Sequence, residues 1–239
     1  NAVASSGQEP SLDNDGFNAK KTVVFNSSNT DSFTLQSNDL LSNNYTVFFV
    51  TESNMSTEGI LLAQYNTDAG RMVIRVNQSG TAGFYAWSGG GQRKASKVPS
   101  LNAPFLGTVI RDGTSVDAWV DGGARTTNSV TFNYSAPTVT NYIGKFVHPS
   151  GTTYSRFNDK ISEIIAFNSA LTDAQIKEVQ FYLSKKWGLE STVDSDGDGV
   201  VDASDFAALD PNVQVNLTVN WDADYMTDEV EAVLKDSSL

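Results

Sequence analysis

Residues 194 to 205 form the segment of this sequence with the clearest chemistry. Its five aspartates stand at positions one, three, five, nine and twelve of a twelve-residue stretch. Calcium-binding loops of this length place oxygen ligands at such positions, with a glycine at position six and a backbone carbonyl at position seven. Gly199 and Val200 occupy those two positions. We therefore expect a Ca²⁺ site formed by Asp194, Asp196, Asp198, Val200, Asp202 and Asp205.

The competing interpretation of this segment is an acidic, solvated linker. A random acidic linker does not place a glycine and the apolar Val201 at the positions that a calcium loop requires. Position twelve holds Asp205 where such loops carry a glutamate. Because aspartate has the shorter side chain, bidentate coordination is less favourable there and we expect a modest affinity.

A second acidic cluster lies near the C-terminal end of the sequence. It contains Asp222, Asp224, Asp228 and Glu231. The first half of the corresponding loop is two residues short, and no glycine provides the turn. A helix beginning at Thr227 with acidic residues in its first turn explains the same pattern. Both interpretations, a second Ca²⁺ site and a helix start, remain open.

Aromatic residues on the expected strands are the candidates for binding carbohydrate. Tyr85 and Trp87 are two residues apart, so on a strand they point to the same side of the sheet. Trp87 also adjoins the glycine-rich turn 88–91. Trp119 and Tyr142 are further candidates. Aromatic side chains also dominate sandwich cores, so burial is the alternative for each.

The sequence lacks a recognisable catalytic group. Retaining glycoside hydrolysis needs two carboxylates about 5 Å apart, and Glu163 stands alone on its expected strand. His148 is the single histidine, and there is no cysteine for a nucleophile or a thiolate metal site. We expect no enzymatic activity.

These candidates depend on short strands separated by turns. The expected strands are 22–25, 45–50, 59–65, 71–76, 83–87, 106–111, 115–120, 129–133, 138–143 and 160–167. Asp112-Gly113 and Asp121-Gly122-Gly123 are among the turn signals between them. Short strands at such spacing predict an all-β antiparallel sandwich or barrel.

One helix is expected after the strands, from Asp173 to about Trp187. Thr172 and Gln175 have the spacing of a capping box. Apolar residues recur at helical spacing through Trp187, and Gly188 suits the left-handed position that ends a helix. We expect this helix to pack on the sandwich.

Composition limits the partners of the chain. The formal net charge is −12, with 28 acidic and 16 basic residues. Nucleic acids and anionic membranes are disfavoured because a basic surface is missing. No stretch approaches the roughly 20 apolar residues of a membrane span, so we expect no membrane insertion.

Two parts of the sequence resemble known families. The stretches 109–116, 119–122, 143–144, 160–175 and 182–189 resemble bacterial laminin G-like and concanavalin A-like (lectin/glucanase superfamily) sandwiches. The stretch 194–211 resembles thrombospondin type 3 calcium repeats and the related dockerin loop. The first resemblance implies a jelly roll that acts in adhesion or glycan binding, and the second implies an extracellular setting rich in calcium.

Together these observations predict a sandwich over residues 1–189, a calcium loop and linker over 190–211, and a strand–helix appendage or truncated next module over 212–239. We expect a secreted or cell-surface, lectin-like module that binds Ca²⁺ and a glycan or polysaccharide. Three alternatives remain open: a protein-binding module of dockerin type, a structural spacer in an adhesin, and a non-catalytic appendage of a polysaccharide-degrading enzyme.

Overall fold

The computed structural model describes residues 2–35, 44–52, 59–65, 71–76, 84–88, 91–94, 102–129, 140–148, 150–154 and 157–213. Within these ranges it describes only the backbone of residues 65, 71, 84–88, 91–94, 128 and 154.

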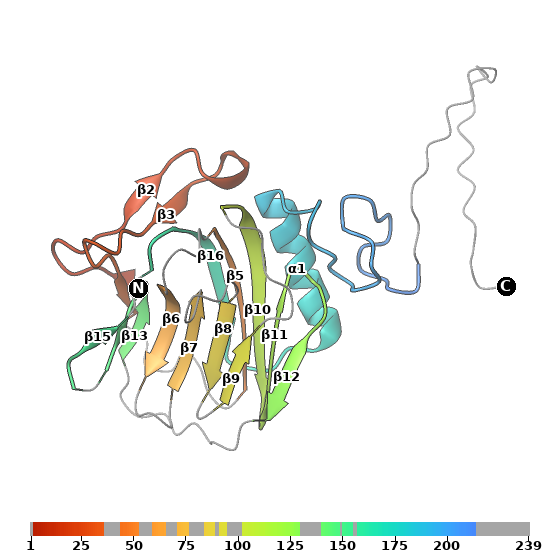
Figure 1. Cartoon of the computed structure of the whole chain (residues 1–239). Coiled ribbons are helices and arrows are strands. Elements are labelled where there is room, and N and C mark those ends of the chain that lie inside the picture. The colour runs from red at the N-terminus through yellow and green to blue at the C-terminus, as the bar shows by residue number, and fades with distance from the viewer. Residues whose placement is uncertain are drawn as a thin grey trace, which may run out of the picture.

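Two antiparallel sheets form the body of the molecule (Figure 1). In spatial order the first contains β1 (Ala2–Val3), β4 (Phe33–Leu35), β13 (Thr140–Ile143), β6 (Gly59–Tyr65), β7 (Arg71–Val76), β8 (Phe84–Ser88) and β9 (Gly91–Lys94). The second contains β12 (Thr126–Ser129), β11 (Ser115–Val120), β10 (Pro104–Asp112), β5 (Tyr45–Glu52), β16 (Lys160–Phe167), β3 (Thr22–Val24) and β2 (Ser11–Asp13). A short hairpin, β14 (Phe146–Val147) with β15 (Thr153–Tyr154), and a 3-10 turn, η1 (Phe17–Ala19), complete the set.

The second sheet is buried on both faces. Successive side chains of a strand point to opposite faces, and β5 shows the consequence. Val47 and Phe49 pack into the core between the two sheets, whereas Phe48 and Val50 pack into a second core on the outer face. This explains why residues 47–50 of β5 form a continuous apolar run rather than an alternating one.

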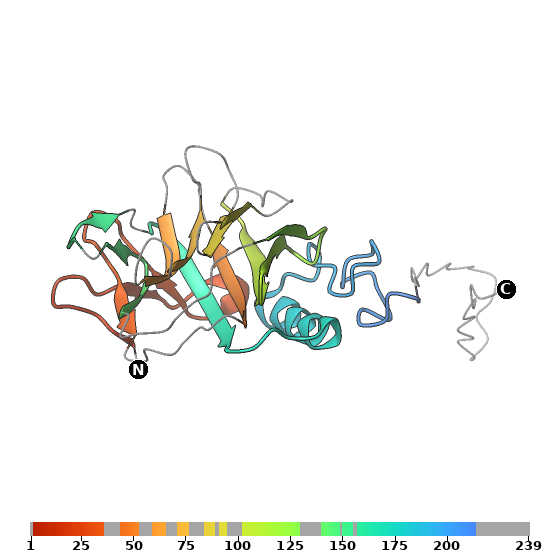
Figure 2. The ribbon, with the colours of Figure 1, turned by 90° about the horizontal axis from the view of Figure 1, so that it is seen from below.

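Helix α1 (Asp173–Trp187) covers that outer face (Figure 2). The Thr172 hydroxyl accepts from the Gln175 backbone N–H, and the Gln175 side chain accepts from the Thr172 N–H, so the predicted capping box is present. Gly188 ends the helix in the left-handed conformation, with φ +69°. Ile176, Leu183 and Trp187 are buried against the sheet. The boundaries and the docking of this helix confirm the prediction.

The all-β sandwich is confirmed. Strand β12 spans Thr126–Ser129 and pairs with β11 across the turn at Asp121-Gly122-Gly123. Beyond Ser129, the predicted strand 129–133 lies outside the described residues. The appendage beyond residue 213 lies outside the described residues. No helix in the described part of the chain has the length and apolar character needed to cross a membrane.

Candidate metal centre and adjoining cleft

The acidic loop folds its first three aspartates around one point. Ligand oxygens of Asp194, Asp196 and Asp198 all lie within 4.8 Å of one another. Gly197 and Gly199 have φ values of +79° and +99°, a region that favours glycine. These two turns direct the Gly197 and Gly199 N–H groups to the Asp194 carboxylate, at 2.8 and 2.9 Å. The positions of Gly197 and Gly199 therefore allow the loop to turn so that the three aspartate side chains converge.

Two buried carboxylate oxygens face the loop interior without a hydrogen-bond donor from the described residues. They are Oδ2 of Asp196 and Oδ2 of Asp205. Their Oδ1 atoms accept from backbone N–H groups, of Asp198 at 3.2 Å and of Ala207 at 2.8 Å. Asp196 is only 7% exposed. Leaving a buried polar group without a hydrogen-bond partner costs about 1–3 kcal/mol, and more for a charged group, so a cation, a proton or a water molecule at these oxygens would stabilise the loop.

Electrostatics leads to the same conclusion. Burial, together with the negative charges of Asp198 and Asp205, raises the pKa of Asp196 to about 6. Burial also raises the pKa of Asp205, with a contribution from the charge of Asp198. The two carboxylates therefore belong to one electrostatic group, which joins positions three and twelve of the loop.

Asp202 connects the loop to α1. Its Oδ1 accepts from the Ser195 N–H at 2.8 Å, and its Oδ2 accepts from the Ser195 hydroxyl at 2.8 Å and from the Ser184 hydroxyl of α1. The side chain is buried, with 3% exposure. These contacts fasten the loop to the helix. Asp202 and the Val200 carbonyl remain predicted metal ligands.

The loop is also fastened to the turn between β11 and β12. The Asp194 N–H donates to the Asp121 carbonyl at 3.1 Å. Gly122 has φ +72°, and a Cβ atom there would lie 1.6 Å from the Asp194 carbonyl oxygen. Val193, just before the loop, is fully buried in the core beneath α1. The metal loop is therefore a packed part of the sandwich.

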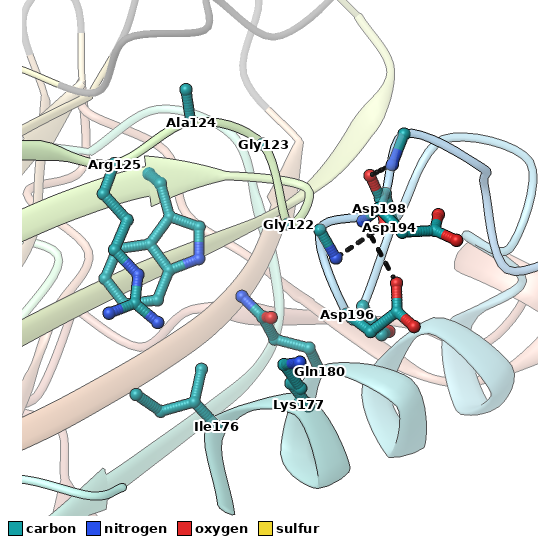
Figure 3. A pocket seen from close by; sticks show the side chains of 14 residues that line it. Gly122, Gly123, Ala124, Arg125, Ile176, Lys177, Gln180, Asp194, Asp196 and Asp198 are labelled. Carbon is teal, nitrogen blue, oxygen red and sulfur yellow. Dashed lines mark hydrogen bonds between the residues drawn. The ribbon is translucent and has the colours of Figure 1, made fainter. Parts of the chain in front are cut away.

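A cleft of about 440 Å³ lies between this loop, α1 and the β11–β12 turn (Figure 3). Its lining residues are Trp119, Gly122, Gly123, Ala124, Arg125, Ile176, Lys177, Gln180 and residues 194–199. Arg125, Lys177 and Gln180 carry no individual signal in the sequence, and Gly122 is visible there only as a turn residue, because only the folded chain brings their three elements together.

The aromatic candidates Trp119 and Tyr142 lie on different sheets of the sandwich. Trp119 is on β11 in the second sheet, is 2% exposed and lies beneath the Arg125 guanidinium, 4.5 Å from the ring centre. Tyr142 is on β13 in the first sheet, half-buried, with Lys145 5.2 Å from its ring. Tyr85 and Trp87 are placed on β8, but their side chains lie outside the described residues. The second acidic cluster, Asp222 to Glu231, also lies outside them.

The two isolated polar residues have structural partners. Glu163 on β16 accepts from the Trp187 indole N–H at 2.7 Å and from the Lys186 ammonium at 2.9 Å, which ties the sheet to α1. His148 Nδ1 lies 2.7 Å from the Ser150 hydroxyl in the β14–β15 turn. These contacts account for both residues without a catalytic role.

Comparison with known proteins supports the fold. No protein-family model matches this sequence, and no curated protein matches it. Among solved structures, the chain is similar to domain 4 of AbnA, a GH43 extracellular arabinanase from Geobacillus stearothermophilus, in complex with arabinotriose. The TM-score is 0.55 at 16% identity, over 73% of this chain and 82% of that one.

A second similar structure is the CBM40 module of the IT-sialidase of Ruminococcus gnavus, bound to α2,3-sialyllactose. Its TM-score is 0.50 at 11% identity, over 59% of this chain and 83% of that one. At these identities the two likenesses establish a shared β-sandwich fold.

Proposed function

We propose that this chain is a calcium-binding, non-catalytic carbohydrate-recognition module that works outside the cell. The observation that carries the calcium assignment is the buried Oδ2 of Asp196, which has no hydrogen-bond donor from the described residues and belongs to a group of converging carboxylates.

The donor set fits calcium better than other metals. The cluster offers carboxylate oxygens alone, which suit hard cations such as Ca²⁺, whereas zinc and copper sites use histidine and cysteine. Asp194, Asp196, Asp198, Asp202 and Asp205 would hold the ion, together with the Val200 carbonyl. Water molecules or a ligand would complete the six to eight oxygens that Ca²⁺ takes. The bound ion would neutralise the repulsion among these carboxylates.

The carbohydrate assignment is supported by the fold. The arabinanase domain and the CBM40 module have the same sandwich and are described in complex with arabinotriose and with sialyllactose. Tyr85, Trp87 and Tyr142 lie on strands of the first sheet, whereas α1 covers the outer face of the second sheet. We propose that they contribute to a glycan surface on that sheet.

Calorimetry with CaCl2 tests the calcium assignment. The wild-type chain is expected to bind at least one Ca²⁺, and the double variant Asp196→Ala/Asp198→Ala is expected to lose the tightest site. The control is Asp15→Asn/Asp112→Asn, which removes two exposed carboxylates from turns of the sandwich. Unchanged binding by the first double variant would refute the assignment of the loop.

A glycan array, run with calcium and with chelator, tests the recognition assignment. A specific hit is expected, and Trp87→Ala is expected to weaken it while the fold persists. A folded protein without any hit in either condition would refute glycan recognition. Calcium binding without glycan binding would favour a spacer, because Asp202 and Gly122 fix the loop firmly to the sandwich.

A further inference from the structure

The cleft beside the calcium loop has one wall with positively charged side chains and one wall with negatively charged side chains (Figure 3). One wall carries the cations Arg125 and Lys177, and the other carries the carboxylates of Asp194, Asp196 and Asp198. Four glycines, Gly122, Gly123, Gly197 and Gly199, line the space between these walls and contribute no side chains. The backbone is therefore open to close approach by a ligand.

The cationic wall is held in place before any ligand binds. The Arg125 guanidinium stacks 4.5 Å from the Trp119 ring centre and donates to Asp173 Oδ1 at 2.7 Å. This ion pair occupies one edge of the planar group, and a guanidinium has five N–H donors. Lys177 follows Asp173 by one helical turn and makes no ion pair with a described residue. Arg125 is thus paired with Asp173, and the charge of Lys177 acts on Asp210. An anionic ligand would use the remaining N–H donors of Arg125 and the Lys177 ammonium.

The acidic wall decides when an anion can enter. Without a metal, three carboxylates line the cleft and repel a negative ligand. A calcium ion in the loop would add two positive charges, and it would prefer oxygen donors to complete its coordination. Calcium would therefore reduce the repulsion of a carboxylate by this wall and would offer a coordination position to a ligand oxygen.

The volume limits the size of the ligand. Small-molecule pockets span about 300–1,000 Å³, and this cleft is near the lower end at about 440 Å³. Ile176 and Trp119 contribute apolar atoms, and the Gln180 amide is also at its lining. This mixture suits one or two sugar rings, with an apolar face, several hydroxyls and one charged group.

We propose that this cleft is a saccharide subsite for a sugar residue that carries a carboxylate, with Arg125 and Lys177 binding the carboxylate and the calcium loop forming the opposite wall. The proposal rests on the calcium binding proposed above. It places an acidic-sugar subsite on the α1 side of the molecule, separate from the aromatic residues of the first sheet.

The test is an NMR titration of nitrogen-15-labelled full chain with methyl glucuronide, in calcium and in chelator. Methyl glucoside and sodium acetate are the matched probes, lacking the carboxylate and the sugar respectively. In calcium, methyl glucuronide is expected to shift the amide signals of Gly122, Gly123 and Gly197 and to bind more tightly than either probe. Arg125→Gln and Lys177→Gln are each expected to weaken it about tenfold, the loss of one charge-assisted hydrogen bond. Lys21→Gln, an exposed lysine before β3, is expected to leave it unchanged.

Calcium calorimetry on the same samples separates the two proposals. If calcium binds but methyl glucuronide causes no shift at these glycines, the cleft proposal is overturned and the calcium site stands. Equal binding of methyl glucoside or acetate also overturns it, as does unchanged affinity in both cleft variants. Glucuronide binding that is as tight in chelator overturns the role of the calcium wall. Absence of calcium binding refutes the proposed function itself.

Discussion

Replacing Gly122 with alanine is expected to separate the metal loop from the sandwich. A Cβ atom at this position would lie 1.6 Å from the Asp194 carbonyl oxygen, which is backbone and cannot rotate away. Gly113→Ala is a matched control, since Gly113 also has a positive φ, +53°, but has no atom within 4 Å of the added Cβ. Both variants carry the backbone cost of a left-handed alanine, about 1–2 kcal/mol. Only Gly122→Ala adds the collision.

The collision can be relieved if Asp194 moves away from the turn. That movement breaks the hydrogen bond from the Asp194 N–H to the Asp121 carbonyl, a contribution of about 1 kcal/mol. It also exposes part of the Val193 side chain, whose complete burial contributes about 1.5–3 kcal/mol to stability. We expect the free energy of unfolding to fall by about 4 kcal/mol in Gly122→Ala and by about 1 kcal/mol in Gly113→Ala.

Urea unfolding in saturating calcium and in chelator measures these changes, and calorimetry measures the calcium affinity of each variant. Gly122→Ala is expected to bind calcium more weakly than the wild-type chain, whereas Gly113→Ala is expected to bind it normally. Equal losses of stability in the two variants, with equal calcium affinities, would show that the loop is not fastened at Gly122 and would refute this reasoning.

Three further predictions concern the carboxylates of the loop. Asp196→Asn is expected to raise the melting temperature in chelator, because it removes a buried charge, and to lower it in calcium, because it removes a ligand; a change of the same sign in both conditions would contradict this. In chelator, the free energy of unfolding of the wild-type chain is expected to fall as the pH rises from about 4 to about 6. Asp196 has a pKa of about 6 in the native state and about 3.9 in the unfolded state. Between these values the native state holds a proton that the unfolded state releases, so a rising pH favours unfolding. Calcium affinity is expected to rise over the same pH range, and titrations at pH 5 and 7 measure it. Ser184→Ala is expected to cost about 1–2 kcal/mol in urea unfolding by removing one donor to Asp202. The calcium stoichiometry is expected to stay unchanged because the Asp202 carboxylate remains, and loss of the calcium site would contradict this.

Several elements could be predicted from local sequence because their causes are local. The capping pair Thr172 and Gln175 and the final Gly188 define both ends of α1 within a few residues of the chain. The runs 59–65, 71–76, 115–120 and 160–167 match β6, β7, β11 and β16. In each case the apolar pattern and the flanking turn residues contain the needed information.

Short strands could not be predicted in this way. β1, β2, β4, β14 and β15 contain two or three residues each, too few for a period of two to be recognised. Their partners determine them: β4, for example, pairs with β13, which is more than a hundred residues away in the chain. Residues 126–128 of β12 were likewise not predicted as a strand, since their pairing with β11 places them in the sheet.

The sequence by itself determined the sandwich class, the covering helix and the convergence of Asp194, Asp196 and Asp198, because the aspartate and glycine spacing acts within one short loop. Only the tertiary structure decided the attachment of Asp202 to α1, which depends on the Ser184 hydroxyl. The burial of Trp119 and the cleft between Arg125, Lys177 and the loop were likewise decided by packing. The physical reason is the same in each case: a side chain's function depends on its neighbours in space, and those neighbours come from elements that no local pattern connects.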